Sequence, residues 1–94
     1  MDFEFAKRGG EEFAFQHQEG DKIDAEISWT QLGDVMVVDH TFVDDALRGQ
    51  GIARQLVDRA ADYAREKNYK IEPVCSYVAS TFEKSTDYDD VKVS

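Results

Sequence analysis

The sequence holds one cysteine, one proline and no long apolar segment, and each shortage excludes a class of protein. Cys75, the single cysteine, cannot form an internal disulfide bond, which is typical of proteins from a reducing compartment such as the cytosol. No run of about 18 apolar residues is present, so the sequence predicts no membrane-spanning helix. The first residues also lack the basic region and apolar core of a signal peptide. We therefore expect a cytoplasmic protein with no membrane partner.

Basic residues are also scarce: 11 lysine and arginine residues stand against 20 acidic residues, for a formal net charge of −9. Because such a field repels the phosphates of nucleic acids, we expect no nucleic-acid partner. The negative electrostatic field would attract a cationic partner such as an amine. The same negative charge also serves simply to keep a protein in solution. The sequence predicts no metal site, and we expect a monomer or a weak homodimer.

With 94 residues, of which 41% are hydrophobic, the sequence predicts one folded domain, residues 1–94, around one modest core. Apolar and polar residues alternate around residues 3–5, 13–15 and 23–29, which indicates three β-strands. Glycines after each segment mark turns, so we expect an antiparallel meander. His17 is expected to be exposed and without a role. The aromatic residues expected in the core are Phe3, Phe5, Phe13, Phe15 and Trp29.

The rest of the chain is organised around residues 34–68. A β-branched run from Val35 to Val43 predicts a buried strand. Apolar residues then recur every three or four positions, which predicts a helix from about Gln50 to Lys67, with Asn68 as a left-handed stop. Two ion pairs are expected on the outer side of this helix, Arg54–Asp58 and Arg59–Asp62.

A further strand and helix are predicted after the long helix. The strand comprises Tyr69, Ile71, Val74 and Cys75, and it should end or splay at Pro73. It should run parallel to the strand before the long helix, through a right-handed crossover. Ser76 is expected to cap a second helix that reaches Lys84, and residues 88–94 predict a turn and a final strand.

Gly49 and Gly51 lie between the buried strand and the long helix, where they permit positive φ and a close approach of a ligand to the backbone. The first N–H groups of a helix have no intrahelical partner, and the helix dipole adds positive charge, so a phosphate or pyrophosphate suits this place. A Walker loop is excluded because no lysine is present in the loop. A dinucleotide-binding fingerprint fits poorly because Arg54 stands where a third glycine or alanine is needed.

The loop matches the pattern R-x-x-G-x-A, with Arg48, Gly51 and Ala53 at the fixed places. This resembles the acetyl-CoA loop of the Gcn5-related N-acetyltransferases. His40-Thr41-Phe42-Val43 before the loop and Pro73-Val74-Cys75-Ser76-Tyr77 after the helix look like the small single-domain group of that family, and the resemblance covers nearly the whole chain. It implies a mixed α/β acyltransferase fold, acetyl-CoA as cofactor, and transfer of acetyl to an amine of a small molecule or a protein. The N-terminal helices that usually wall the acceptor site have no counterpart here, so the acceptor is not carried over.

The resemblance also implies which residues bind coenzyme A. Backbone N–H groups of the loop would hold the pyrophosphate, and two arginines would add positive charge. At a splayed strand edge, the backbone of two further residues would bond the amides of the pantetheine arm. The expected set is Phe42, Val43, Arg48, Gly49, Gln50, Gly51, Ile52, Ala53 and Arg54.

Three residues are candidates for catalysis: Cys75, His40 and Tyr77. We expect Cys75 and His40 on two neighbouring strands, on either side of the place where these strands separate (the splay). In one mechanism, His40 helps to remove a proton from an amine that attacks the thioester directly, while Cys75 or Tyr77 protonates the departing sulfur. In the other, Cys75 first takes the acetyl group as a nucleophile. A cysteine or tyrosine in such a place also commonly serves only for packing.

Two further functions stay open at this point. One is a module that binds CoA or senses acyl-CoA without turnover, because the acceptor wall is missing. The other is a protein-interaction domain whose loop binds no nucleotide.

Overall fold

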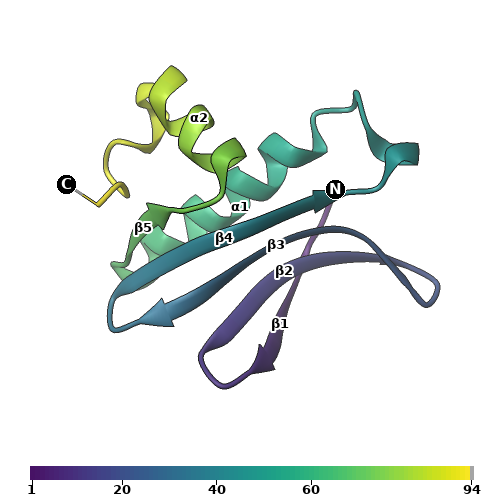
Figure 1. Cartoon of the computed structure of the whole chain (residues 1–94), viewed down its shortest axis with the longest axis horizontal. Helices are drawn as coiled ribbons and strands as arrows, with labels where there is room; N and C mark the ends of the chain where they lie inside the picture. The colour runs from purple at the N-terminus through teal and green to yellow at the C-terminus, as the bar shows by residue number, and fades with distance from the viewer. Residues whose placement is uncertain (94) are drawn as a thin grey trace.

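A computed structural model describes residues 1–93 and contains one five-stranded sheet and two α-helices (Figure 1). The predicted mixed α/β fold is confirmed. In chain order the elements are β1 (Glu4–Gly9), β2 (Glu12–Glu19), β3 (Lys22–Leu32), β4 (Val35–Val43), the short 3-10 helix η1 (Asp45–Leu47), α1 (Ile52–Lys67), β5 (Lys70–Pro73), α2 (Ser76–Lys84) and the 3-10 helix η2 (Thr86–Tyr88).

The sheet has the strand order of the sequence, from β1 to β5. The first four strands form the predicted antiparallel meander, and β5 pairs parallel to β4 after the crossover through α1, as predicted. The expected final strand is reduced to one bridge, between Ile71 and Lys92. Ser94, the last residue of that prediction, lies outside the described residues.

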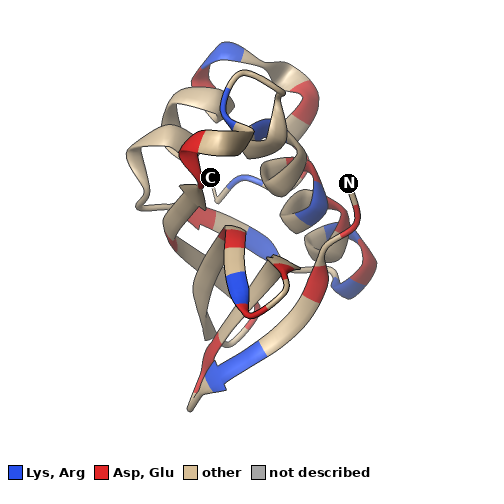
Figure 2. Ribbon diagram, turned by 90° about the vertical axis from the view of Figure 1, so that its right-hand side faces the viewer, with Lys and Arg blue, Asp and Glu red and all other residues tan. Residues whose placement is uncertain are grey.

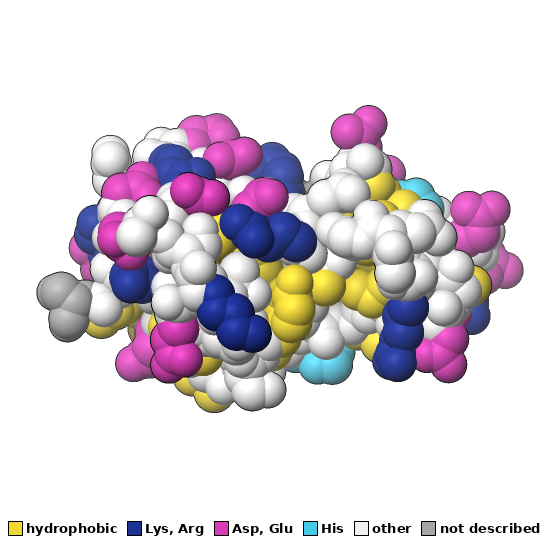
Figure 3. Space-filling view, turned by 90° about the horizontal axis from the view of Figure 1, so that it is seen from above, with side chains coloured by type: hydrophobic (Ala, Val, Ile, Leu, Met, Phe, Trp, Pro, Cys, Tyr) yellow, Lys and Arg dark blue, Asp and Glu magenta, His cyan; other side chains and the backbone are white. Residues whose placement is uncertain are grey.

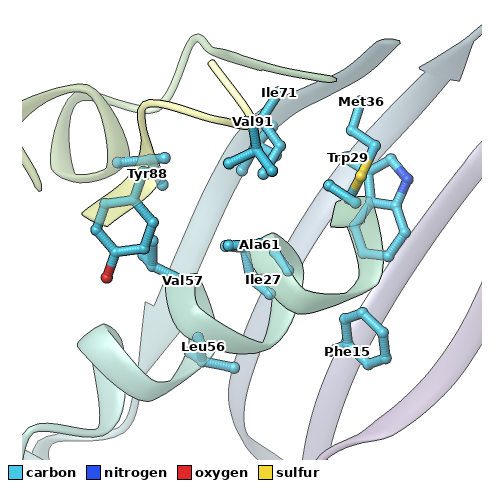
Figure 4. Close-up of a cluster of buried hydrophobic side chains, with 14 of the residues drawn as sticks. Phe15, Ile27, Trp29, Met36, Leu56, Val57, Ala61, Ile71, Tyr88 and Val91 are labelled. Atoms are coloured by element: carbon cyan, nitrogen blue, oxygen red, sulfur yellow. The ribbon is translucent and has the colours of Figure 1, made fainter. Parts of the chain in front are cut away.

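Both helices pack into one core with a single face of the sheet. Along β3, Ile27 and Trp29 are buried in this core, while Ser28 between them points to the opposite face. Figure 4 shows how the sheet, α1 and the C-terminal segment meet there. The side chains of this core that it labels are Phe15, Ile27, Trp29, Met36, Leu56, Val57, Ala61, Ile71, Tyr88 and Val91.

Two sequence-based expectations about the first strands are wrong. His17 is half-buried and its Nδ1 lies 2.7 Å from Oδ1 of the buried Asp24, because Asp24 is an extra, unpaired residue of β3 that shifts the register between His17 and Gln18. Phe5 is 45% exposed because β1 is the edge of the sheet, although its ring stacks on those of Phe13 and Tyr63. Phe15 and Trp29 are buried as predicted, and Phe3 and Phe13 are partly buried.

The boundaries of the helices differ slightly from the prediction. Asn68 ends α1 in the left-handed conformation, as predicted, but α1 begins at Ile52 and not at Gln50. The residue that caps α2 is Cys75, and Ser76 is already helical. None of the helices in the described chain is both long and apolar enough to cross a membrane.

The segment after α2 is held against α1 by two arginines. Arg54 donates from Nε to the hydroxyl of the buried Tyr88, and that hydroxyl donates to Asp58. The predicted ion pair between Arg54 and Asp58 is present at 3.6 Å. Further along α1, Arg65 donates from Nε to a carboxylate oxygen of Asp90 at 2.8 Å. These contacts fix the C-terminal segment beside the start and the end of α1.

Charges of both signs lie along the outer side of α1 (Figure 2). The predicted pair of Arg59 with Asp62 is wrong, because Asp62 accepts a hydrogen bond from Arg65 at 3.0 Å. The guanidinium of Arg59 lies instead over the ring of Phe15, 4.3 Å from its centre. Arg59 therefore closes the aromatic part of the core and does not add an exposed ion pair.

Candidate active site

The sheet opens between β4 and β5. Their pairing ends where Val38 lies opposite Pro73, while β4 continues to Val43. The N–H groups of Val74 and Cys75 both donate to the carbonyl of Val38 at 2.9 Å, and the chain then leaves the sheet. Residues 39–43 of β4 therefore form a free strand edge on this side, in the region expected for the splay.

The start of α1 offers a row of unpaired donors. Gly49 and Gly51 have φ of 83° and 73°, the left-handed region that glycine adopts most readily. The first bond of the helix runs from the N–H of Gln55 to the carbonyl of Gly51 at 3.2 Å, and Gly51 has no side chain to cap the helix. No oxygen of residues 1–93 accepts a hydrogen bond from the N–H groups of residues 49–54. Such a row is suited to an anion.

These donors line a groove of about 390 Å³. Seen from above, hydrophobic side chains gather in a hollow near the middle of the molecule, with lysine or arginine side chains beside it (Figure 3). Most of the expected site residues line the groove, but Phe42, Gln50, His40 and Cys75 do not. Two lining residues, Thr41 and Leu47, are not among the predicted site residues. The full lining is Thr41, Val43, Leu47, Arg48, Gly49, Gly51, Ile52, Ala53, Arg54 and Tyr77.

The two arginines of the groove differ in how firmly they are held. Arg48 is exposed, and the ion pair that it forms with the exposed Asp45 at 3.1 Å is of the kind that costs little to break. Arg54 is bound to Tyr88 and also lies 3.4 Å from Asp87. The hydrogen bond with Tyr88 raises the pKa of Arg54. Arg48 is therefore the arginine free to turn toward a phosphate.

Cys75 stands at the N-terminus of α2, half-buried, with its sulfur 3.4 Å from Oγ1 of Thr41 on β4. Burial raises the pKa of the thiol, but the hydrogen bond with Thr41 and the N–H groups of Val78, Tyr77 and Thr41 outweigh this effect. The pKa of Cys75 is consequently lower than that of an ordinary thiol. A lowered pKa favours the thiolate, which is the nucleophilic form.

The expected placement of Cys75 on a strand beside His40 is wrong. Pro73 ends β5, so Cys75 belongs to the turn into α2, and its partner on β4 is Thr41. His40 is the neighbouring residue and points to the other face of the sheet, where it is exposed and lies opposite Ser28 of β3. Tyr77, 39% exposed, lies in the first turn of α2 at the groove.

Comparisons with known proteins identify the family and the fold. Residues 12–91 match the family described as GCN5-related N-acetyl-transferase. The solution structure of a GCN5-like candidate N-acetyltransferase from Staphylococcus aureus is 34% identical with a TM-score of 0.70, over 96% of this chain and 87% of that chain.

No group of three or more potential metal ligands occurs within residues 1–93.

More distant structures share the fold. The ribosomal-protein-S18-alanine N-acetyltransferase from Escherichia coli is 17% identical with a TM-score of 0.66, over 82% of this chain and 53% of that chain. An aminoglycoside acetyltransferase from an uncultured soil metagenomic sample is 18% identical with a TM-score of 0.65, over 85% of this chain and 59% of that chain. This chain thus spans only a little over half of these larger enzymes.

The family match covers most of the chain. It confirms the expectation of an acetyl-CoA-dependent N-acetyltransferase at the level of the family, and the acceptor amine is not specified. The chain belongs to the GCN5-related N-acetyltransferases.

Proposed function

We propose that the chain acetylates a primary amine, with the pyrophosphate of acetyl-CoA on the N–H groups of residues 49–54. The observation that carries this proposal is the row of unpaired donors at the groove. Arg48 would exchange its exposed partner, Asp45, for a phosphate. Because Gly49 and Gly51 have no Cβ, the diphosphate would meet only backbone along this part of the loop.

The free edge of β4 would hold the pantetheine arm. Residues 39–43 have lost their parallel neighbour beyond Val38, so backbone groups of this edge are available to the amides of the arm, as in other cases of strand addition. Phe42 and Val43 would contribute through their backbone. An arm that follows this edge from the groove toward Val38 passes the sulfur of Cys75, which already lies against Thr41.

Acetyl-CoA would supply an acetyl thioester at this place. Cys75 is the residue suited to take the acetyl group, because its lowered pKa favours the thiolate. A bond would form between the sulfur of Cys75 and the acetyl carbon while the bond to the sulfur of CoA breaks. Attack by the amine would then form the amide bond and return the thiolate. The alternative is direct attack, in which Cys75 or Tyr77 gives a proton to the departing sulfur.

His40 would take the proton that the amine must lose. An amine similar to lysine, with a pKa near 10.4, is almost wholly charged at neutral pH and attacks only after deprotonation. His40 is exposed on the open face of the sheet beside the splay, so an incoming amine can reach it. An imidazole accepts a proton in this pH range, directly or through water.

The acceptor class and the location are also proposals. The similar enzymes from Escherichia coli and from soil are named for a ribosomal protein and for aminoglycosides, so the fold serves both protein and small-molecule amines. A reactive thiol at Cys75 is best preserved in a reducing compartment, and we propose the cytoplasm.

Mass spectrometry of the protein with acetyl-CoA and no amine tests the covalent route. We expect a gain of one acetyl group on Cys75, which an added amine removes and which Cys75→Ala abolishes. CoA binding by Cys75→Ala should be unchanged, because Cys75 does not line the groove. An unmodified Cys75, together with full transfer by Cys75→Ala to a panel of amines, would refute the nucleophile and leave direct attack.

A further inference from the structure

Two polar side chains are buried on the face of β3 that points away from the helices. Glu26 is 8% exposed and Ser28 is 4% exposed. They alternate with Ile27 and Trp29, which are buried in the core, so both lie on the opposite face. Polar groups in such positions normally serve a hydrogen bond, because burial without one is costly.

The hydroxyl of Ser28 has no such bond within residues 1–93. No fully enclosed side-chain nitrogen or oxygen of the described chain lacks a partner, so this unpaired hydroxyl must still reach the open face. The hydroxyl of Ser28 can therefore donate and accept hydrogen bonds at the open face of the sheet, although the residue is almost entirely buried.

Glu26 adds a carboxylate that can accept further hydrogen bonds. Oε2 accepts from Nε2 of Gln16 at 2.6 Å, and Oε1 lies 3.4 Å from Nη1 of Arg8. A carboxylate has about four acceptor sites, so these two partners do not saturate it. The side chain of Arg8 is 41% exposed, which makes its long contact one that a better-placed cation can replace.

Both residues lie directly across from the proposed catalytic strand. Ser28 is paired with His40, and Glu26 with Phe42. Side chains opposite each other in an antiparallel pair have Cβ atoms about 5 Å apart, so a group bound to Ser28 lies beside the His40 ring. Because β5 ends at Pro73, β4 has no parallel neighbour beyond Val38, and His40 and Thr41 follow one another along this unpaired edge, with Thr41 in contact with Cys75.

We propose, on the basis of the proposed function, that Glu26 and Ser28 form the acceptor site and select a primary ammonium on a hydrocarbon stem. The carboxylate would bind the charged amine, the hydroxyl would orient it toward His40, and the exposed ring of Phe42 would contact the stem. The net charge of −9 draws such a cation to the molecule.

NMR titration of the amide signals with n-butylamine at neutral pH tests this site. We expect saturable shifts at residues 26–28 and 40–42, and none with 1-butanol, which has no charge. The dissociation constant should rise about tenfold or more in Glu26→Gln and about threefold in Ser28→Ala. Glu12→Gln is the matched control, because Glu12 is exposed on the same face and lies opposite Thr30.

The site is refuted if butylamine shifts other residues, or if Glu26→Gln binds it as tightly as Glu12→Gln. Should Glu26→Gln fail to fold, Ser28→Ala decides, and affinity equal to that of the unchanged protein overturns the proposal. A parallel CoA titration separates this site from the cofactor site. Loss of the CoA shifts at residues 49–54 with butylamine binding intact would count against the proposed function alone.

Discussion

The sulfur of Cys75 lies 3.4 Å from Oγ1 of Thr41, across the splay between β4 and the start of α2. This contact places the thiol at the free edge of β4 and not against His40, which is exposed on the other face. In the proposed mechanism, the nucleophile and the proton acceptor would thus act from opposite faces of the sheet.

Thr41→Val should make the Cys75 thiol less reactive. Burial raises the pKa of the thiol, and the Thr41 hydroxyl is the largest of the groups that lower it, so the pKa should rise when that hydroxyl is lost. Alkylation by iodoacetamide should become slower at neutral pH, and the rise of its rate with pH should move to higher pH. Thr30→Val, the same exchange on β3, should alkylate like the unchanged protein, and equal rates for both variants would contradict the role given to Thr41.

Gly51→Ala should weaken CoA binding far more than Gly33→Ala. The two glycines have φ of 73° and 60°, and an added Cβ meets no atom within 4 Å at either position. Each variant should therefore lose a similar stability, about 1–2 kcal/mol, from left-handed strain alone. Only Gly51 lies at the groove, so calorimetric titration with CoA should detect a loss of affinity in Gly51→Ala alone. Equal affinities would show that the start of α1 does not hold the cofactor.

His40→Gln should lower acetyl transfer to an amine by about 10²–10⁴, the usual contribution of a general base. CoA binding should be unchanged, because His40 does not line the groove. His17→Gln provides the control, since His17 is engaged with Asp24 near the far end of β2. Steady-state rates with a fixed amine decide the point, and full activity in His40→Gln would remove this residue from the mechanism.

Tyr88 should make the protein sensitive to alkali. Burial, followed by the hydrogen bond to Asp58, raises its pKa to about 12 from the ordinary 10.0. The unfolded chain releases this proton near pH 10 and the folded chain only near pH 12, so the free energy of unfolding should fall across that window, by up to about 3 kcal/mol. Urea unfolding at both ends of the window should show a smaller fall in Tyr88→Phe than in Tyr77→Phe. An equal fall in both would contradict this account.

The strands and the long helix could be predicted because their signals are local. Period-two alternation from Ile23 to Trp29 and the glycines at each turn are enough to give the meander. The left-handed glycine before α1 and Asn68 after it follow from residue type. The resemblance to the acetyl-CoA loop of the family could be seen at Arg48, Gly51 and Ala53 because it is a short continuous pattern.

Contacts that depend on tertiary placement could not be predicted in this way. The bulge of β3 at Asp24 brings its carboxylate to His17, which was expected to be exposed, and no residue type in the sequence indicates this bulge. The bond of Arg54 with Tyr88 joins residues 34 positions apart, through packing that the sequence does not display. The partner of Cys75 was misplaced because Pro73 ends β5 early and moves the cysteine into the turn before α2.

A comparison of two amide-shift maps, one with CoA and one with pantetheine, tests the central claim that the start of α1 holds a diphosphate. CoA should shift residues 49–54 and the β4 edge at 39–43, whereas pantetheine, which lacks the diphosphate, should shift only the edge. Unmoved signals at residues 49–54 with saturating CoA, or equal shifts there with pantetheine, would contradict the account.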